Sequence, residues 1–69
     1  MKRNAKTLNK ILRQLREKKG LSQRALADEV DITGAYIAQL ETGVRTNPSL
    51  VVLQRLAKAL KVPVAELLR

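Results

Sequence analysis

The side chains in this sequence that are best suited to chemistry are cations gathered near the N-terminus. The 69 residues include 14 Lys and Arg against 6 Asp and Glu, which gives a formal charge of +8 at pH 7. Residues 1–20 alone hold eight cations and a single anion, Glu17, and so carry +7 of this charge. A concentrated basic segment on a small domain suits a polyanion such as DNA, RNA or an anionic membrane surface. The alternative is a solvated helix face that only aids solubility.

Other kinds of chemistry are poorly supplied, because the sequence has neither Cys nor His. It therefore lacks a disulfide framework, thiolate and imidazole metal ligands, and an imidazole base for catalysis. We expect a protein that is not an enzyme and that uses no cofactor. The carboxylates of Asp28, Glu29 and Asp31 resemble a cation site only superficially, since acids near the N-terminus of a helix interact favourably with its dipole, and we expect no metal. No apolar run approaches about 18 residues and no signal peptide is evident, so we expect a soluble, cytoplasmic protein.

Four apolar residues near the N-terminus recur with the spacing of one helix face, namely Leu8, Ile11, Leu12 and Leu15. This pattern predicts a helix over about residues 7–18, with Lys10 among the cations on its polar face. Gly20 is suited to end this helix. Residues 1–6 are then expected to form a basic N-terminal arm, and residues 7–69 a single domain.

Two shorter helices are predicted next. Ser22 is a good N-cap for a second helix of barely two turns. Residues 31–33 then form a short turn, in which Thr33 can cap a third helix over residues 34–42. Gly43 ends the third helix.

The C-terminal part of the sequence predicts two more helices. An Asn-Pro pair at residues 47–48 signals a turn into a fourth helix, and Pro63 is suited to the first turn of a fifth helix that ends at Leu68. The core stripe of the fourth helix is expected to consist of Leu50, Leu53, Leu56, Ala57 and Leu60. Because no strand alternation, internal repeat or flexible linker is present, we expect an all-α fold, a compact five-helix bundle.

The second and third helices have the sequence pattern of a DNA-binding helix-turn-helix unit. Two short helices are joined by a three-residue turn, the first begins Ser-Gln and packs through Ala27, and the second presents a polar outer face. The runs LREKKGLSQRALA (15–27), YIAQLETG (36–43) and NPSL (47–50) resemble the phage-repressor family, also called Cro/C1 or XRE. The resemblance covers residues 8–68.

This resemblance implies a five-helix domain of the lambda-repressor-like type whose third helix lies in the major groove of double-stranded DNA. The positions that would face base edges or nearby phosphates are Thr33, Gly34, Ala35, Tyr36 and Gln39. The positions that would contact the DNA backbone are Lys10, Gln23, Arg45, Thr46 and Asn47. Gln23 would also brace Gln39. Gln can pair with adenine, Ala can touch a thymine methyl and Arg can neutralise phosphate.

Some of these residues have alternative interpretations. Similar proteins form a salt bridge between the glutamate at the position of Glu41 and a basic residue at the position of Arg16, which would join the first and third helices. The alternative is a contact of Glu41 with a DNA base. Tyr36 either contacts the groove or phosphate, or packs in the core. For Gln23 and Gln39 the alternative is simple solvation.

The sequence departs from the family pattern in the turn and at the start of the third helix. Asp31 stands where Gly is usual, and Asp tolerates a positive φ at some cost. Gly34 and Ala35 stand where many relatives present longer polar side chains. Tyr36, Gln39, methyl contacts and DNA shape must then supply specificity.

A single reading helix covers only a few base pairs, so domains of this type act as dimers on half-sites about 34 Å apart. The sequence ends at Arg69, so we expect the domain itself to dimerise, weakly and with help from DNA, through Val64 and Leu67. Ordinary core packing is the alternative role of these two residues. No small-molecule ligand or membrane partner is expected.

The function implied by the resemblance is transcriptional repression or autoregulation by a homodimer on a palindromic operator, in a prokaryotic cytoplasm and on the nucleoid when bound. Activation, as in controller proteins of restriction-modification systems, uses the same fold. The fold also suits an antitoxin module or an adaptor that binds proteins.

Overall fold

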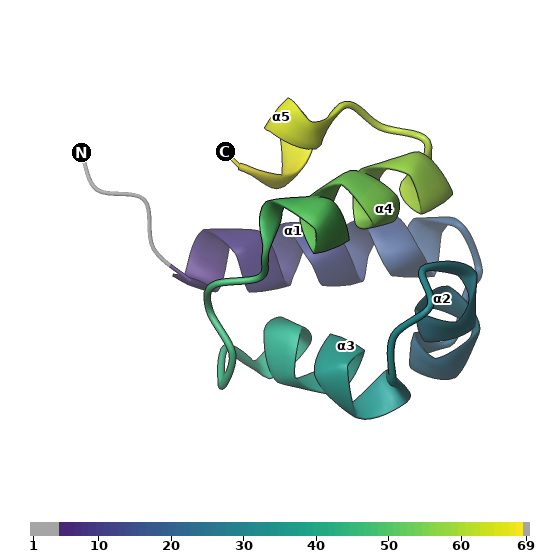
Figure 1. Ribbon diagram of the computed structural model, residues 1–69, viewed down its shortest axis with the longest axis horizontal. Coiled ribbons are helices and arrows are strands. Elements are labelled where there is room, and N and C mark those ends of the chain that lie inside the picture. The colour runs from purple at the N-terminus through teal and green to yellow at the C-terminus, as the bar shows by residue number, and fades with distance from the viewer. Residues whose placement is uncertain (1–4, 69) are drawn as a thin grey trace.

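The computed structural model describes residues 5–68, with side chains for residues 8–68. This range contains five helices and no strand: α1 (Ala5–Lys18), α2 (Gln23–Glu29), α3 (Gly34–Thr42), α4 (Leu50–Leu60) and α5 (Val64–Leu67) (Figure 1). The predicted all-α five-helix fold is confirmed. The helix start was predicted at about residue 7, but α1 begins at Ala5, because Ala and Lys favour helix without needing core contacts. The first four residues of the predicted arm and Arg69 lie outside the described residues.

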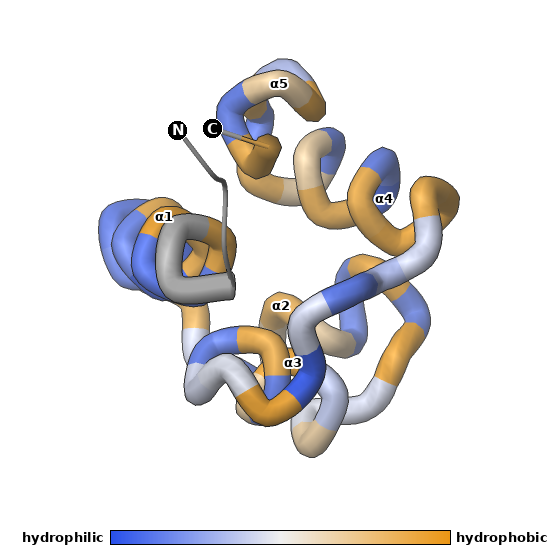
Figure 2. Tube along the Cα trace, turned by 90° about the vertical axis from the view of Figure 1, so that its left-hand side faces the viewer, coloured by the Kyte–Doolittle hydropathy of each residue, from blue (hydrophilic) through white to orange (hydrophobic). Residues whose placement is uncertain are grey.

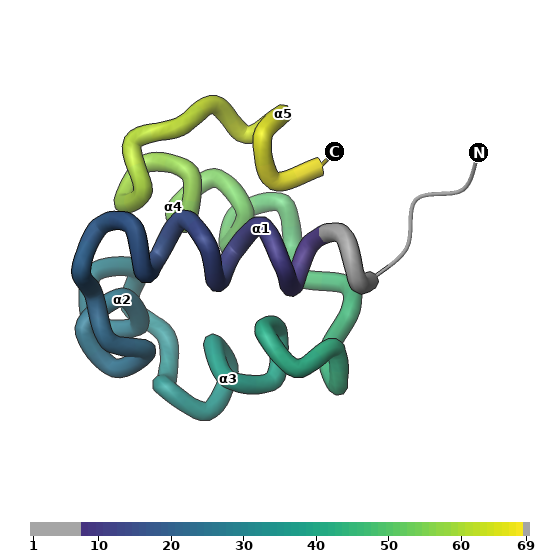
Figure 3. Tube along the Cα trace, turned by 180° about the vertical axis from the view of Figure 1, so that it is seen from behind, coloured from purple at the N-terminus to yellow at the C-terminus, as the bar shows by residue number. Residues whose placement is uncertain are grey.

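α1 forms one side of the bundle (Figure 2). Seen from behind, it lies between α3 on one side of the view and α4 and α5 on the other (Figure 3). α1 contacts α3 and α5, while α2 contacts α3 and α4. Viewed along α1, its hydrophilic residues lie on the side that faces away from the other helices (Figure 2). This distribution follows from the amphipathic spacing of its leucines.

Three helices begin at hydroxyl caps, and the sequence predicted two of them, Ser22 and Thr33. The side chain of Ser22 accepts a hydrogen bond from the backbone N–H of Ala25 at 3.0 Å, and that of Thr33 accepts from Tyr36 at 3.1 Å. Ser49 caps α4 in the same way, at 3.2 Å from the nitrogen of Val52. Each cap satisfies one of the backbone donors that a helix N-terminus leaves unpaired.

α1, α2 and α4 end in the same way, with one residue in the left-handed conformation. Gly20, Asp31 and Lys61 have φ values of 73°, 60° and 60°. After each of them the next backbone N–H donates to a carbonyl five residues earlier, as in Leu21 to Arg16 at 3.1 Å, the pattern of a Schellman motif. Asp31 therefore preserves the turn in place of Gly, as expected, whereas the positive φ of Lys61 was not predicted.

The core combines buried side chains from all five helices. Its members are Leu12, Leu26, Ala27, Val30, Ile37, Leu40, Leu53, Leu56, Ala57, Leu60 and Leu67. One predicted core residue was wrong, because Leu50 is 61% exposed. The spacing placed it on the stripe of α4, but Leu50 is the first residue of that helix, where Val51 is also exposed. Within residues 5–68, no helix has the length and apolar character needed to cross a membrane.

Candidate nucleic-acid interface

The α2–turn–α3 unit has a fixed geometry because both helices are anchored in the core. Leu26 and Ala27 of α2 and Ile37 and Leu40 of α3 are all buried. The small side chain of Ala27, only 1% exposed, allows the two helices to approach closely. α3 consequently lies along one edge of the domain, with one side turned outward (Figure 1).

The outward side of α3 carries residues that the sequence placed near DNA. Thr33 and Ala35 are exposed, whereas Gly34, Tyr36 and Gln39 are half-buried. Helical geometry directs Ala35 and Gln39 away from the core, and Tyr36 lies at the boundary between core and surface. Part of Tyr36 packs against the core cluster; its contact with DNA stays a prediction.

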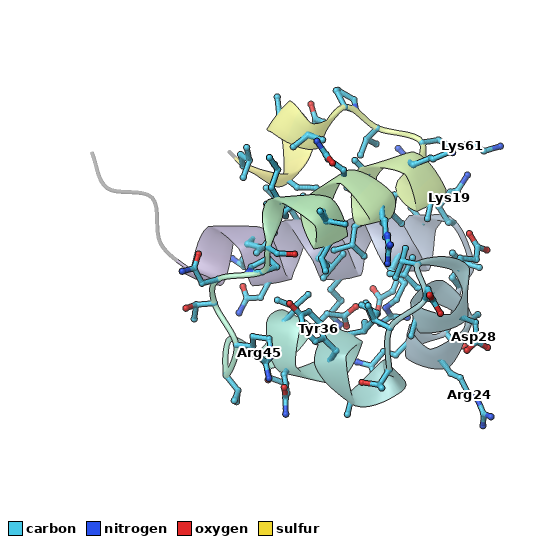
Figure 4. All side chains as sticks on the ribbon, viewed as in Figure 1. Lys19, Arg24, Asp28, Tyr36, Arg45 and Lys61 are labelled. Atoms are coloured by element: carbon cyan, nitrogen blue, oxygen red, sulfur yellow. The ribbon has the colours of Figure 1, made fainter. Side chains whose placement is uncertain are left out.

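Tyr36, Gln39 and Arg45 form a cluster at the C-terminal half of α3. Arg45 belongs to the loop after α3, and its Nε donates a hydrogen bond to Oε1 of Gln39 at 3.1 Å. The Arg45 guanidinium carbon also lies 4.7 Å from the centroid of the Tyr36 ring, within cation–π distance. Figure 4 shows Tyr36 on α3 and Arg45 in the loop beside it. Sequence reasoning named all three residues but assigned them separate roles and missed the cluster.

Gly43 is the reason that the loop returns to α3. Its φ of 85° turns the chain back, and the backbone N–H of Arg45 then donates to the carbonyl of Gln39 at 3.1 Å. A side chain at this position would also meet Asn9 of α1, since an added Cβ would lie 3.2 Å from its Nδ2. The spacing of Tyr36 and Gln39, together with a left-handed Gly two residues before Arg45, is the signal that could have predicted the cluster.

A second cluster joins α3 to α1 and to the start of α2. Arg16 of α1 donates to both carboxylate oxygens of Glu41, from Nε at 2.6 Å and from Nη2 at 3.1 Å. Its Nη1 donates to the carbonyl of Leu21 at 2.6 Å. Gln23, the first residue of α2, donates from Nε2 to Glu41 at 3.1 Å. We call this set the Arg16–Glu41–Gln23 network.

The network is largely withdrawn from water. The side chains of Arg16 and Glu41 are 11% and 3% exposed. The hydrogen bond with Glu41 raises the pKa of Arg16 above its ordinary value, although desolvation opposes this effect. Glu41 therefore accepts hydrogen bonds inside the domain and is not exposed for a contact with a DNA base. The expectation that Gln23 braces Gln39 is wrong, because the amide of Gln23 donates to Glu41 and that of Gln39 accepts from Arg45.

The remaining predicted backbone contacts lie at the surface. Lys10 is exposed on α1, and Thr46 and Asn47 are exposed in the loop between α3 and α4. Gln23 is half-buried at the start of α2. All four therefore remain reachable from outside the domain.

The predicted dimer residues at the C-terminus are only partly available. Leu67 is 1% exposed and belongs to the core, so its assignment to an interface is wrong and the alternative, core packing, applies. Because α5 is only four residues long, Leu67 is the buried residue through which it packs onto the bundle. Val64 is half-buried against the core. Leu68, at 41%, and Val51, at 54%, are more exposed apolar side chains in this part of the molecule.

The α2–turn–α3 unit within a five-helix bundle defines a helix-turn-helix domain. The sequence profile of the helix-turn-helix family matches residues 12–67, and the chain belongs to that family. The resemblance to Cro/C1-type proteins is thereby confirmed.

Two proteins of known structure have the same fold as this chain. The restriction-modification controller protein C.AhdI from Aeromonas hydrophila is 40% identical, with a TM-score of 0.86, and the match covers 91% of this chain and 94% of that protein. SinR, described as a master regulator for biofilm formation and solved in complex with DNA, is 31% identical with a TM-score of 0.86, over 90% of this chain and 98% of the other.

A curated relative is considerably longer. The transcriptional regulator SlrR of Bacillus subtilis is 37% identical over 60 residues, which are 87% of this chain but 40% of SlrR. The chain thus spans less than half the length of this relative.

Proposed function

We propose that the chain is a sequence-specific, double-stranded DNA-binding transcriptional regulator that places α3 in the major groove. The observation that carries this proposal is the cluster of Tyr36, Gln39 and Arg45 on the exposed side of the second helix of a helix-turn-helix unit. Side chains of these types hydrogen-bond to base edges and phosphates. The relatives C.AhdI, named a controller protein, and SinR, solved with DNA, support the same function here.

The contacts divide into two groups under this proposal. Ala35 offers a methyl group to a thymine methyl, while Gly34 lets the helix backbone approach the DNA closely. The hydroxyl of Thr33 already caps α3, so the remaining hydrogen-bonding side chains on this helix near DNA are Tyr36 and Gln39, which act together with Arg45. Phosphates are contacted by Lys10, Gln23, Thr46 and Asn47.

The net charge of +8 supplies general attraction to DNA. Each neutralised phosphate contributes about −0.9 to the slope of log affinity against log salt concentration. The charge therefore sets how strongly the protein holds any duplex, whereas the nearly uncharged face of α3 selects the sequence.

The protein acts as a homodimer on a palindromic operator in this proposal, because one α3 reads only a few base pairs and two copies related by a two-fold axis span half-sites about 34 Å apart. Val64 and the exposed Leu68 are the apolar side chains of the α5 region that can face a second copy. Sedimentation of the free protein should show a weak dimer that an operator duplex strengthens. A tight dimer without DNA, or independent binding of monomers at unrelated positions, would contradict this arrangement.

Repression or autoregulation is the outcome we propose, since a dimer that covers an operator overlapping a promoter blocks RNA polymerase. The cytoplasm of a prokaryotic cell is the corresponding location.

The deciding experiment selects bound duplexes from a random pool and compares the wild type with a Tyr36→Ala/Gln39→Ala variant. We expect an inverted-repeat motif for the wild type and a loss of about 1–3 kcal/mol of discrimination for each base contact removed. Lys61→Gln is the matched control, because it removes a charge on the side of the domain opposite α3 (Figure 4). Unchanged selectivity of the double variant would refute α3 as the reader and would favour an adaptor or antitoxin role.

A further inference from the structure

The guanidinium of Arg45 contacts two residues of α3, although Arg45 lies in an exposed loop. Its Nε–H is directed by Gln39 at 3.1 Å, one face lies over Tyr36 with the guanidinium carbon 4.7 Å from the ring centroid, and its own backbone N–H is tied to the carbonyl of Gln39. A side chain of this length ordinarily keeps most of its rotamer freedom at a surface. Here Gln39 and Tyr36 both contact the guanidinium and restrain it within the domain itself.

The Nη1 and Nη2 groups of the Arg45 guanidinium, which these contacts do not use, can donate to a bidentate acceptor. A guanidinium has five N–H groups, and Gln39 uses only the one on Nε. Within residues 8–68 no side chain or carbonyl accepts a hydrogen bond from Nη1 or Nη2 of Arg45, and the residue is exposed. Two parallel donors at the end of a planar group match O6 and N7 of guanine in the major groove.

We infer that Arg45 reads a guanine and that Tyr36 and Gln39 are its positioning residues, instead of Arg45 serving as the phosphate contact that the sequence indicated. The inference rests on the proposed DNA-binding function. A bidentate contact with guanine needs two parallel donors, and Nη1 and Nη2 of Arg45 supply them. A phosphate can accept the same pair of donors, so the test below separates the two acceptors.

The other α3 residues strengthen this assignment. The Oε1 atom of Gln39, which would accept from adenine N6, already accepts from Arg45. The Thr33 hydroxyl accepts from the backbone N–H of Tyr36, and Gly34 and Ala35 bring no side-chain donors. Arg45 is therefore the described residue on this face with the most unused donors, and we expect one G·C pair at a fixed position of each half-site.

The test measures base preference, position by position, with the full chain and a set of duplexes that vary the operator selected by the wild type. The variants are Arg45→Lys, Arg45→Ala and Gln39→Ala, with Lys61→Gln as the control for loss of one distant charge. Far-UV circular dichroism checks that each variant remains helical.

We expect the wild type to prefer guanine over the other bases by about 5- to 150-fold at one position of each half-site. Arg45→Ala should abolish this preference, whereas Arg45→Lys, which keeps the charge and can still donate to guanine, should weaken it. Gln39→Ala should weaken the preference at the same position, and combining it with Arg45→Ala should reduce the preference no further than Arg45→Ala alone. Lys61→Gln should leave it intact.

Two results overturn the inference. If Arg45→Ala keeps the guanine preference, the contact of Arg45 with guanine is refuted. If Arg45→Ala lowers affinity for all sequences by one factor and reduces the salt slope by about 1, Arg45 contacts a phosphate. In both cases the proposed function survives because the wild type still selects an operator; a wild type that selects no sequence refutes both.

Discussion

Replacing Glu41 by Ala tests whether the Arg16–Glu41–Gln23 network stabilises the domain. The Glu41 carboxylate accepts two hydrogen bonds from Arg16 and one from Gln23, at 2.6, 3.1 and 3.1 Å. Its removal leaves the Arg16 guanidinium with the carbonyl of Leu21 and with the carboxylate of Glu17, which lies 3.9 Å from Nη2. A charge that is 11% exposed would then have lost its main partner.

The cost follows from the burial of the pair. Removing one partner of a buried ion pair costs about 3–5 kcal/mol. Because water reaches part of Arg16 and Glu17 remains nearby, we expect the lower end, about 3 kcal/mol. A domain of this length has a total free energy of unfolding of roughly 3–10 kcal/mol, so Glu41→Ala should remove a large part of it. Glu41→Gln should cost less, about 1–2 kcal/mol, because the amide oxygen can still accept.

Urea unfolding followed by circular dichroism measures these differences. The comparison variant is Glu17→Ala: Glu17 is 56% exposed and lies near both Arg13 and Arg16, and pairs this exposed contribute little. A Glu41→Ala variant within about 0.5 kcal/mol of the wild type would show that the network is not a source of stability.

Three further predictions concern stability. Leu67→Ala should lower the free energy of unfolding by about 2–5 kcal/mol in urea titrations, because the side chain is 1% exposed in the core. A loss below about 1 kcal/mol would show that Leu67 is not a core residue. Lys61→Gly should raise the free energy of unfolding by up to about 1 kcal/mol in the same titrations. The gain should exceed that of Asp31→Gly, because both residues have a φ of 60° but Asp tolerates a positive φ better than Lys. The opposite order would refute this account of the helix ends. Glu41 raises the pKa of Arg16, so the contribution of Arg16 to stability is complete below the ordinary pKa of arginine and is lost only as pH rises through the raised pKa. The difference in free energy of unfolding between the wild type and Arg16→Ala should therefore stay constant from neutral pH to about pH 10. A difference that shrinks within that interval would contradict this prediction.

The sequence predicted those features that depend on a few neighbouring residues. Ser22 and Thr33 were identified as caps because a hydroxyl at a helix N-terminus bonds a nearby backbone N–H, and the third helix has the bounds predicted for it. Features that depend on distant parts of the chain were missed. The stripe of α4 did not reveal that its first turn is uncovered at Leu50, and the left-handed Lys61 has no compositional signal.

The same division applies to the candidate site. Family resemblance paired Arg16 with Glu41, and the structure contains that ion pair. It could not show that Gln23 joins the pair, or that the loop brings Arg45 back over Tyr36, because both contacts depend on how separate helices and a loop pack in three dimensions.

The firm attachment of α3 has a kinetic consequence. The network ties this helix to α1 and α2, and the guanidinium of Arg45 is already oriented, so no segment of residues 8–68 needs to fold or swing before the domain docks on DNA. Encounter should then be limited by diffusion and by attraction between opposite charges, which depend little on the base sequence. Differences between one operator and another would appear chiefly as differences in residence time, since only the departure of the protein requires the contacts with the bases to break.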